Sequence, residues 1–244
     1  MIKNILAISS LCLAFMGAYA QDCTTSLYLQ KGKTIEMTIY DKKGEPNGRE
    51  VYQISDVSSG GGTTTGTLNS EMFDKNGNSK AKVNSSITCT GGEIHLDMKL
   101  FLPPQQNEQV AGKMQANAKT SFLNYPNDMK VGDNLPDGNF SIDLSNGNTP
   151  PGGPGGPPGP PPPPFGSRSL TMVINARHVE SQESVTTTAG TWNCFRISFK
   201  SKIRVQTGPL GFPVTVEGTE WYAPGVGIVK SQTKNGGTAI TSIK

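Results

Sequence analysis

The amino-acid sequence predicts an all-β protein, built as a single strongly curved antiparallel sheet or a half-open β-barrel. Three observations lead to this prediction. Apolar and polar residues alternate in many short runs, as they do on strands that bury one face. Turn sequences rich in Gly, Asn and Asp separate these runs. Only 34% of the residues are hydrophobic, which suits one core and many turns.

We expect roughly ten strands, and the clearest one spans residues 93–102 (EIHLDMKLFL). Its residues Ile94, Leu96, Met98 and Leu100 fall on one face, because successive side chains of a strand point to opposite sides. The same alternation occurs in four further stretches, 34–40, 170–174, 195–199 and 212–216.

Turns with favourable chemistry separate the strands. The segments 41–48, 74–78, 90–92 and 234–237 contain Asn-Gly, Gly-Gly or Asp with Gly. Asn-Gly and Gly-Gly allow the positive φ angles that tight hairpins need. Residues 107–119 carry a weak helical pattern, so the prediction includes, as an open alternative, one short helix.

Residues 1–20 have the composition of a signal peptide. Lys3 is followed by the mostly apolar stretch 5–16 and by Ala18-Tyr19-Ala20, a small-x-small cleavage pattern. Cleavage after Ala20 is therefore expected, leaving 21–244 as one β domain. No later run is long enough for a membrane span. We expect an exported protein, periplasmic or extracellular, that is soluble after cleavage.

Three cysteines remain after this cleavage, and they allow three single disulfide pairings. We favour Cys23 with Cys89, since Cys23 lies on a terminal segment that needs anchoring and Cys89 ends a strand-like run. Export would place both in an oxidising compartment. Cys194 would then be a free thiol packed in the core, as unpaired cysteines often are.

A segment at 149–167 consists almost entirely of Pro and Gly. Collagen requires Gly at every third position, but the series Gly153, Gly156 and Gly159 is followed in phase by Pro162. A linker would require a second half that folds alone, and residues 167–244 have few strong apolar positions. We therefore predict a surface loop of one domain. As a polyproline segment it is also a candidate contact for a protein partner.

No arrangement of residues predicts catalysis, a metal site or a cofactor. The chain has two histidines, His95 and His178, and both lie among polar neighbours. Its formal charge is +3, which becomes +2 when Lys3 leaves with the signal peptide. Without a basic run, nucleic acid is not expected as a partner. The sequence thus predicts a protein that is not an enzyme.

The segment EWYAPGVGIVKSQT, residues 220–233, predicts two strands joined by a corner. Trp221 and Tyr222 must point to opposite faces, so only one can enter the core. Pro224 turns the chain, while Gly225 and Gly227 permit a bend or a close backbone approach.

Together with the segments 124–140 and 176–198, this corner resembles the TapB-like family. These are secreted bacterial proteins, best known from Bacteroidetes, with a domain of unknown function. The resemblance covers essentially the whole chain after residue 20, apart from the Pro/Gly segment. It implies one continuous domain and brings no settled activity.

Two functions remain open. The first is a non-enzymatic binding protein that holds a lipid or another apolar ligand on the concave face of its sheet. The candidate ligand face consists of Ile94, Leu96, Met98, Leu100, Leu170, Met172 and Ile174. The same side chains could instead simply form the core. The alternative function is an interaction or structural module of the periplasm or cell surface, with the Pro/Gly loop as its contact.

Overall fold

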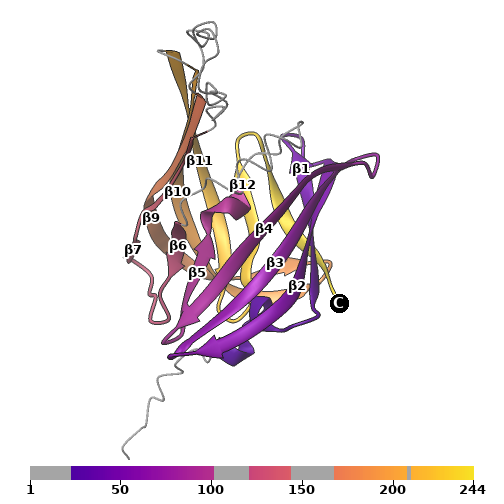
Figure 1. Cartoon of the computed structure of the whole chain (residues 1–244), viewed down its shortest axis with the longest axis vertical. Coiled ribbons are helices and arrows are strands. Elements are labelled where there is room, and N and C mark those ends of the chain that lie inside the picture. The colour runs from indigo at the N-terminus through magenta and orange to yellow at the C-terminus, as the bar shows by residue number, and fades with distance from the viewer. Residues whose placement is uncertain (1–22, 102–120, 144–167, 208–209) are drawn as a thin grey trace, which may run out of the picture.

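In the part of the chain that the structure describes, thirteen antiparallel strands form one continuous sheet, which curls into a nearly closed barrel with a single seam (Figure 1). The computed structural model describes residues 23–101, 121–143, 168–207 and 210–244. The all-β fold class is confirmed, although the strands outnumber the ten expected. The predicted signal peptide at 1–20, the helix considered at 107–119 and the Pro/Gly loop at 149–167 lie outside the described residues.

The elements follow one another along the chain as three short 3-10 helices and thirteen strands: η1 (Cys23–Thr25), η2 (Leu27–Leu29), β1 (Thr34–Asp41), β2 (Pro46–Gly60), β3 (Thr63–Asp74), β4 (Ser79–Thr90), β5 (Glu93–Asp97), η3 (Met98–Phe101), β6 (Phe122–Tyr125), β7 (Asn134–Leu135), β8 (Gly138–Asp143), β9 (Arg168–Thr187), β10 (Gly190–Thr207), β11 (Leu210–Ala223), β12 (Gly227–Thr233) and β13 (Gly236–Ile243).

The strand order is β6-β5-β4-β3-β2-β1-β13-β12-β11-β10-β9-β7, with β8 also paired to β9. Most strands therefore lie beside their sequence neighbours, as short hairpin turns require. The first and last strands pair directly, with Asp41 opposite Gly236 and Ile35 opposite Ile243. This pairing joins the two halves of the chain into one sheet. Its two edges, β6 on one side and β7 with β8 on the other, meet at the seam.

The strand expected at residues 93–102 is shorter than predicted. β5 ends at Asp97, and the chain turns into η3. The Asp97 carboxylate accepts a hydrogen bond from the Lys99 backbone N–H at 3.0 Å, and the Met98 N–H donates to the Ser121 carbonyl at 2.8 Å. A carboxylate that binds the backbone two residues on favours a turn over a strand.

A bulge in β9 reverses which residues face the interior. Leu170, Met172 and Ile174 are buried, and strict alternation would next bury Ala176. Ala176 instead has φ 50°, and three residues of β9 span two residues of β10 at this point. The inward side chain is therefore that of Arg177.

The N-terminal plug, residues Cys23–Leu29, closes the lower end of the barrel in Figure 1. A disulfide joins Cys23 to Cys89 on β4, across a sequence separation of 66. The Leu27 N–H donates to the Gly225 carbonyl at 2.7 Å. Leu27, Tyr28 and Leu29 are buried in the core, so the plug is held by a covalent link, a hydrogen bond and apolar packing.

Cys194 is a buried free thiol on β10. Burial, with Glu183 nearby, raises its pKa to about 11, so the thiol stays protonated at neutral pH.

At the other end of the barrel from the plug, the long strands β9, β10 and β11 rise beyond the rest of the sheet (Figure 1). Val205 and Val214 lie there and are about half exposed.

Candidate functional site

A partly open cavity of about 320 Å³ lies within the barrel, and its lining is mostly apolar. Cavities of about 300–1,000 Å³ with apolar walls and a few polar groups are typical of small-molecule sites. The cavity extends from Tyr28 of the plug to Ile203 and Val216 on the long strands. Small barrels are usually filled by their own side chains, so this unfilled volume is the candidate site.

Four of the seven predicted ligand-face residues line this cavity. They are Leu96 on β5, Leu100 on η3, and Met172 and Ile174 on β9. The strands that carry them lie on both sides of the seam, so closure of the barrel brings together two faces far apart in the sequence. Ligand contact by these side chains stays a prediction.

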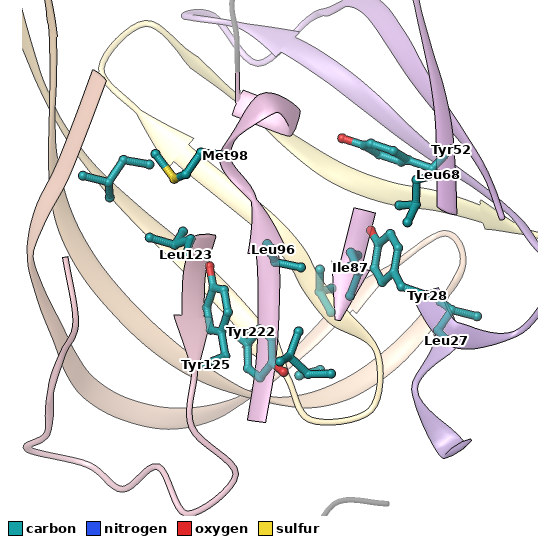
Figure 2. Packing of buried hydrophobic residues seen from close by; sticks show 14 of the residues in the cluster. Leu27, Tyr28, Tyr52, Leu68, Ile87, Leu96, Met98, Leu123, Tyr125 and Tyr222 are labelled. Atoms are coloured by element: carbon teal, nitrogen blue, oxygen red, sulfur yellow. The ribbon is translucent and has the colours of Figure 1, made fainter. Parts of the chain in front are cut away.

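The other three predicted residues, Ile94, Met98 and Leu170, do not line the cavity. All are buried in the core. Figure 2 shows Met98 beside Leu123 of β6. A Cβ atom built on Gly138 of β8 would lie 2.8 Å from the Leu123 side chain and 2.9 Å from the Met98 sulfur. The Met98 and Leu123 side chains therefore pack against β8 across the seam, and only a glycine at position 138 leaves room for them.

Aromatic and sulfur-containing side chains complete the apolar wall. Tyr28, Met37 and Tyr52 line the cavity, and Figure 2 shows the two tyrosines near each other. Their ring centroids are 6.1 Å apart in an edge-to-face arrangement, which is favourable for aromatic pairs. Met37 could have been identified from the alternation of β1. Tyr28 lies before the first strand, and no pattern places it in the interior.

Glu50 on β2 is a polar member of the lining. It lies opposite Met37 of β1 and faces inward with Tyr52, two residues further along the strand. Burial raises the pKa of Glu50 to about 7, while hydrogen bonds from the Tyr52 and Ser70 side chains act to lower it. Glu50 was not among the predicted site residues, although its alternation with Tyr52 and Ile54 is a signal for an inward position.

A second carboxyl, that of Glu220 on β11, also lines the cavity. Its Oε1 atom accepts hydrogen bonds from Tyr125 Oη at 2.9 Å and from Arg177 Nη2 at 3.3 Å. Burial raises the pKa of Glu220, and the Arg177 guanidinium opposes this rise. The positive charge of Arg177 thus compensates the negative charge of the Glu220 carboxyl, which has almost no contact with water.

Arg177 joins the two edges of the barrel. Its Nη1 atom donates to the Asn124 carbonyl of β6 at 2.8 Å and to the Pro136 carbonyl between β7 and β8 at 3.0 Å. The guanidinium also lies 4.6 Å from the centroid of the Tyr125 ring. Its side chain has 0% exposure. No backbone ladder joins β6 to β7 or β8 in the described part of the chain, so these side-chain contacts close the seam.

The corner at residues 220–233 places its two aromatic side chains on opposite faces of the sheet. Tyr222 is buried and its ring stacks on that of Tyr125, with centroids 4.2 Å apart, as Figure 2 shows. Trp221 points outward, where its indole N–H donates to the Glu183 carboxylate. Pro224 is exposed and lies in the turn between β11 and β12.

The two glycines of the corner hold the plug. Gly225 accepts the hydrogen bond from Leu27. Gly227 has φ +105°, and a Cβ atom built on it would lie 2.6 Å from the Tyr28 ring. The Ala-Pro-Gly-Val-Gly sequence therefore lets the backbone turn and lets Tyr28 lie directly against it.

Within the described ranges, no group of three His, Cys, Asp or Glu is arranged to bind a metal ion. His95 and His178 each lie within hydrogen-bond distance of an asparagine side chain, Asn124 and Asn134 respectively. No helix in these ranges has the length and apolar character needed to span a membrane.

A family model described as DUF3108-like matches residues 30–149 and 166–244. The interruption between the two matched ranges falls on the Pro/Gly segment. No curated protein matches the chain.

Two solved structures share the fold. One is a candidate lipoprotein from Parabacteroides distasonis, with 22% identity and a TM-score of 0.67, covering 92% of this chain and 100% of that one. The other is a candidate exported protein with a YmcC-like fold from Bacteroides fragilis, with 20% identity and a TM-score of 0.62, covering 88% and 96%. At these identities the likeness establishes the fold alone.

Proposed function

The chain belongs to the DUF3108-like family, and from this premise we propose that it is an exported, non-enzymatic binding protein that holds an apolar or amphipathic small molecule, such as a lipid, inside its barrel. The observation that carries the proposal is the cavity of about 320 Å³. Burial of a ligand's apolar surface there would contribute about 25 cal/mol per Å² before the costs of association.

Export is part of the proposal. It rests on the signal-peptide composition of residues 1–20, and the names of the two structural neighbours, a candidate lipoprotein and a candidate exported protein, support it. The narrower resemblance to TapB-like proteins stays a prediction within the DUF3108-like family.

Native mass spectrometry tests the binding function on protein purified from its own secretory compartment without detergent. We expect an adduct of lipid-like mass, and we expect at least one class among fatty acids, fatty alcohols, fatty amines and phospholipids to raise the melting temperature. A bare protein mass together with no stabilisation by any of these compounds would contradict the proposal.

A matched pair of variants locates the ligand. Ile203→Trp introduces a bulky side chain into the cavity, because Ile203 belongs to its lining. Val205→Trp, two residues further along β10 on the same face, is the control, since Val205 is 49% exposed outside the cavity. We expect the first variant to lose the adduct and the second to keep it. Equal retention by both would place any bound molecule elsewhere.

The alternative function, a protein-interaction module that uses the Pro/Gly loop, stays a prediction because the loop lies outside the described residues. Deletion of residues 150–166 tests it. If the loop is the contact, the deletion variant keeps its melting temperature and loses a partner in a pull-down. Unchanged pull-downs would remove the basis for this alternative.

A further inference from the structure

The cavity lining holds a carboxyl group, that of Glu50, for which the described residues give no cationic partner, and this group points to the chemistry of a ligand. We propose that the barrel selects amphipathic molecules whose polar end is a protonated amine, with Glu50 as its partner, and disfavours free fatty acids. This inference rests on the binding function proposed above and specifies its ligand class.

The charged side chains of the lining are all acidic. Of the described residues that line the cavity, Glu50 and Glu220 carry carboxyl groups, and none is Lys, Arg or His. An anion moved out of water requires a cation or several hydrogen-bond donors. A fatty-acid carboxylate would instead meet carboxyl groups of its own sign, so it is a poor match for this cavity.

Arg177 cannot serve as the missing cation. Its two Nη atoms already bind Glu220, the Asn124 carbonyl and the Pro136 carbonyl, and its side chain has no exposed surface. The same contacts engage Oε1 of Glu220, which also accepts the Tyr125 hydroxyl. Glu220 therefore has its counter-charge within the protein.

Glu50 is in the opposite situation. The polar groups beside it are the hydroxyl groups of Tyr52, on its own strand, and Ser70, on β3. Tyr28 of the plug also faces it, and Met37 lies opposite on β1. None of these groups is a cation, so among the described residues packed around Glu50 no partner compensates a negative charge there.

An ammonium group placed at Glu50 would supply that charge. The apolar part of the ligand would then lie along the wall formed by Leu96, Leu100, Met172 and Ile174. Charge-assisted hydrogen bonds between an ammonium group and a carboxylate are about twice as strong as neutral ones. The arrangement thus matches an apolar chain with a cationic end.

The proposal also predicts that amine binding depends on pH. Burial raises the pKa of Glu50 to about 7, so Glu50 is mostly neutral at pH 6 and mostly ionised at pH 8. A long-chain amine stays protonated across this range and binds the ionised form. Its affinity should therefore rise about tenfold from pH 6 to pH 8, in proportion to the ionised fraction. A neutral alcohol should show no such rise.

The test compares three probes of equal chain length, dodecylamine, dodecanol and dodecanoate, by calorimetric titration of the full, oxidised protein below the micelle concentrations. At pH 8 we expect dodecylamine to bind at least about tenfold more tightly than dodecanoate, a difference of about 1.4 kcal/mol. Glu50→Gln should remove most of this preference and change dodecanol binding less than about threefold.

Glu36→Gln is the control variant, since Glu36 pairs with Arg49 at 3.3 Å and lies outside the cavity lining. It removes one carboxylate from β1, the strand beside Glu50, and should leave all three affinities unchanged. Dodecanoate binding as tight as dodecylamine, or an amine affinity indifferent to Glu50→Gln and to pH, would overturn the inference and leave the binding function intact. Failure of all three probes to bind would instead contradict the binding function itself. The wild-type pH series decides the matter even if Glu50→Gln does not fold.

Discussion

Replacing Arg177 by Met removes the charge at the barrel seam while keeping an unbranched apolar side chain. The substitution deletes hydrogen bonds to two backbone carbonyls and to Glu220. It also leaves the Glu220 carboxyl, whose side chain is 6% exposed, without a counter-charge. Breaking a buried ion pair by removing one partner costs about 3–5 kcal/mol, and the abandoned carbonyls add to this. We expect a loss of about 4 kcal/mol in the free energy of unfolding.

The size of the loss should depend on pH. Burial raises the pKa of Glu220, and Arg177 opposes this rise in the wild type. Without Arg177, the folded-state pKa lies further above the unfolded value of about 4.3. A carboxyl whose pKa is raised by folding stabilises the protein least at high pH, where folding must bury its charge. The variant should therefore be less impaired at pH 5 than at pH 8.

Urea unfolding followed by tryptophan fluorescence measures both effects, and thermal melting should show a fall of roughly 8–16 °C at pH 8. The double variant Arg177→Met with Glu220→Gln should recover part of the stability, because it removes the unpaired charge. Arg196→Met is the control, since Arg196 forms a half-exposed pair with Glu180 and such pairs contribute less than about 1 kcal/mol. A loss at Arg177 no larger than at Arg196, or equal at both pH values, would refute this account of the seam.

Two further predictions concern the N-terminal plug. Gly227→Ala should lower the free energy of unfolding by about 2–5 kcal/mol, because of the positive φ angle and the close contact with Tyr28. In Gly225→Ala the new Cβ atom would meet no atom within 4 Å. This variant should therefore lose only the conformational part, about 1–2 kcal/mol. Equal melting temperatures for these two variants would show that the ring contact carries no cost. Replacing Cys23 and Cys89 by Ser should lower the free energy of unfolding by about 4 kcal/mol for a loop of this length. A loss below about 1 kcal/mol in urea unfolding would contradict the constraint assigned to the disulfide.

Local patterns predicted much of the fold, because the side chains of a strand alternate with a period of two wherever the strand runs regularly. The stretch 34–40 became β1 and the segment 220–233 became the corner between β11 and β12. The prediction failed at Asp97, where one side chain-to-backbone hydrogen bond ends β5. Turns of this kind depend on a single carboxylate within an otherwise regular pattern.

The seam could not be predicted for a different reason. A bulge at Ala176 reverses the alternation of β9, and only this reversal turns Arg177 inward. Its partners Asn124 and Glu220 lie 53 and 43 residues away in the sequence. Read along the chain, Arg177 and Glu220 are two charged residues among many. Their pairing follows from the way the sheet closes, which no local period encodes.

Closure of the seam by side chains also affects what fixes the diameter of the barrel. In a barrel closed by backbone pairing, strand number and register fix the diameter, and widening it would break a whole row of backbone hydrogen bonds. Here the circle is completed by Arg177 and by apolar packing between β6, β8 and η3. None of these contacts belongs to the backbone ladders that pair the strands. The girth of the barrel along this line is therefore held by side-chain contacts, those of Arg177, of Tyr125 with Glu220 and Tyr222, and of the apolar packing beside Gly138, and not by a backbone ladder.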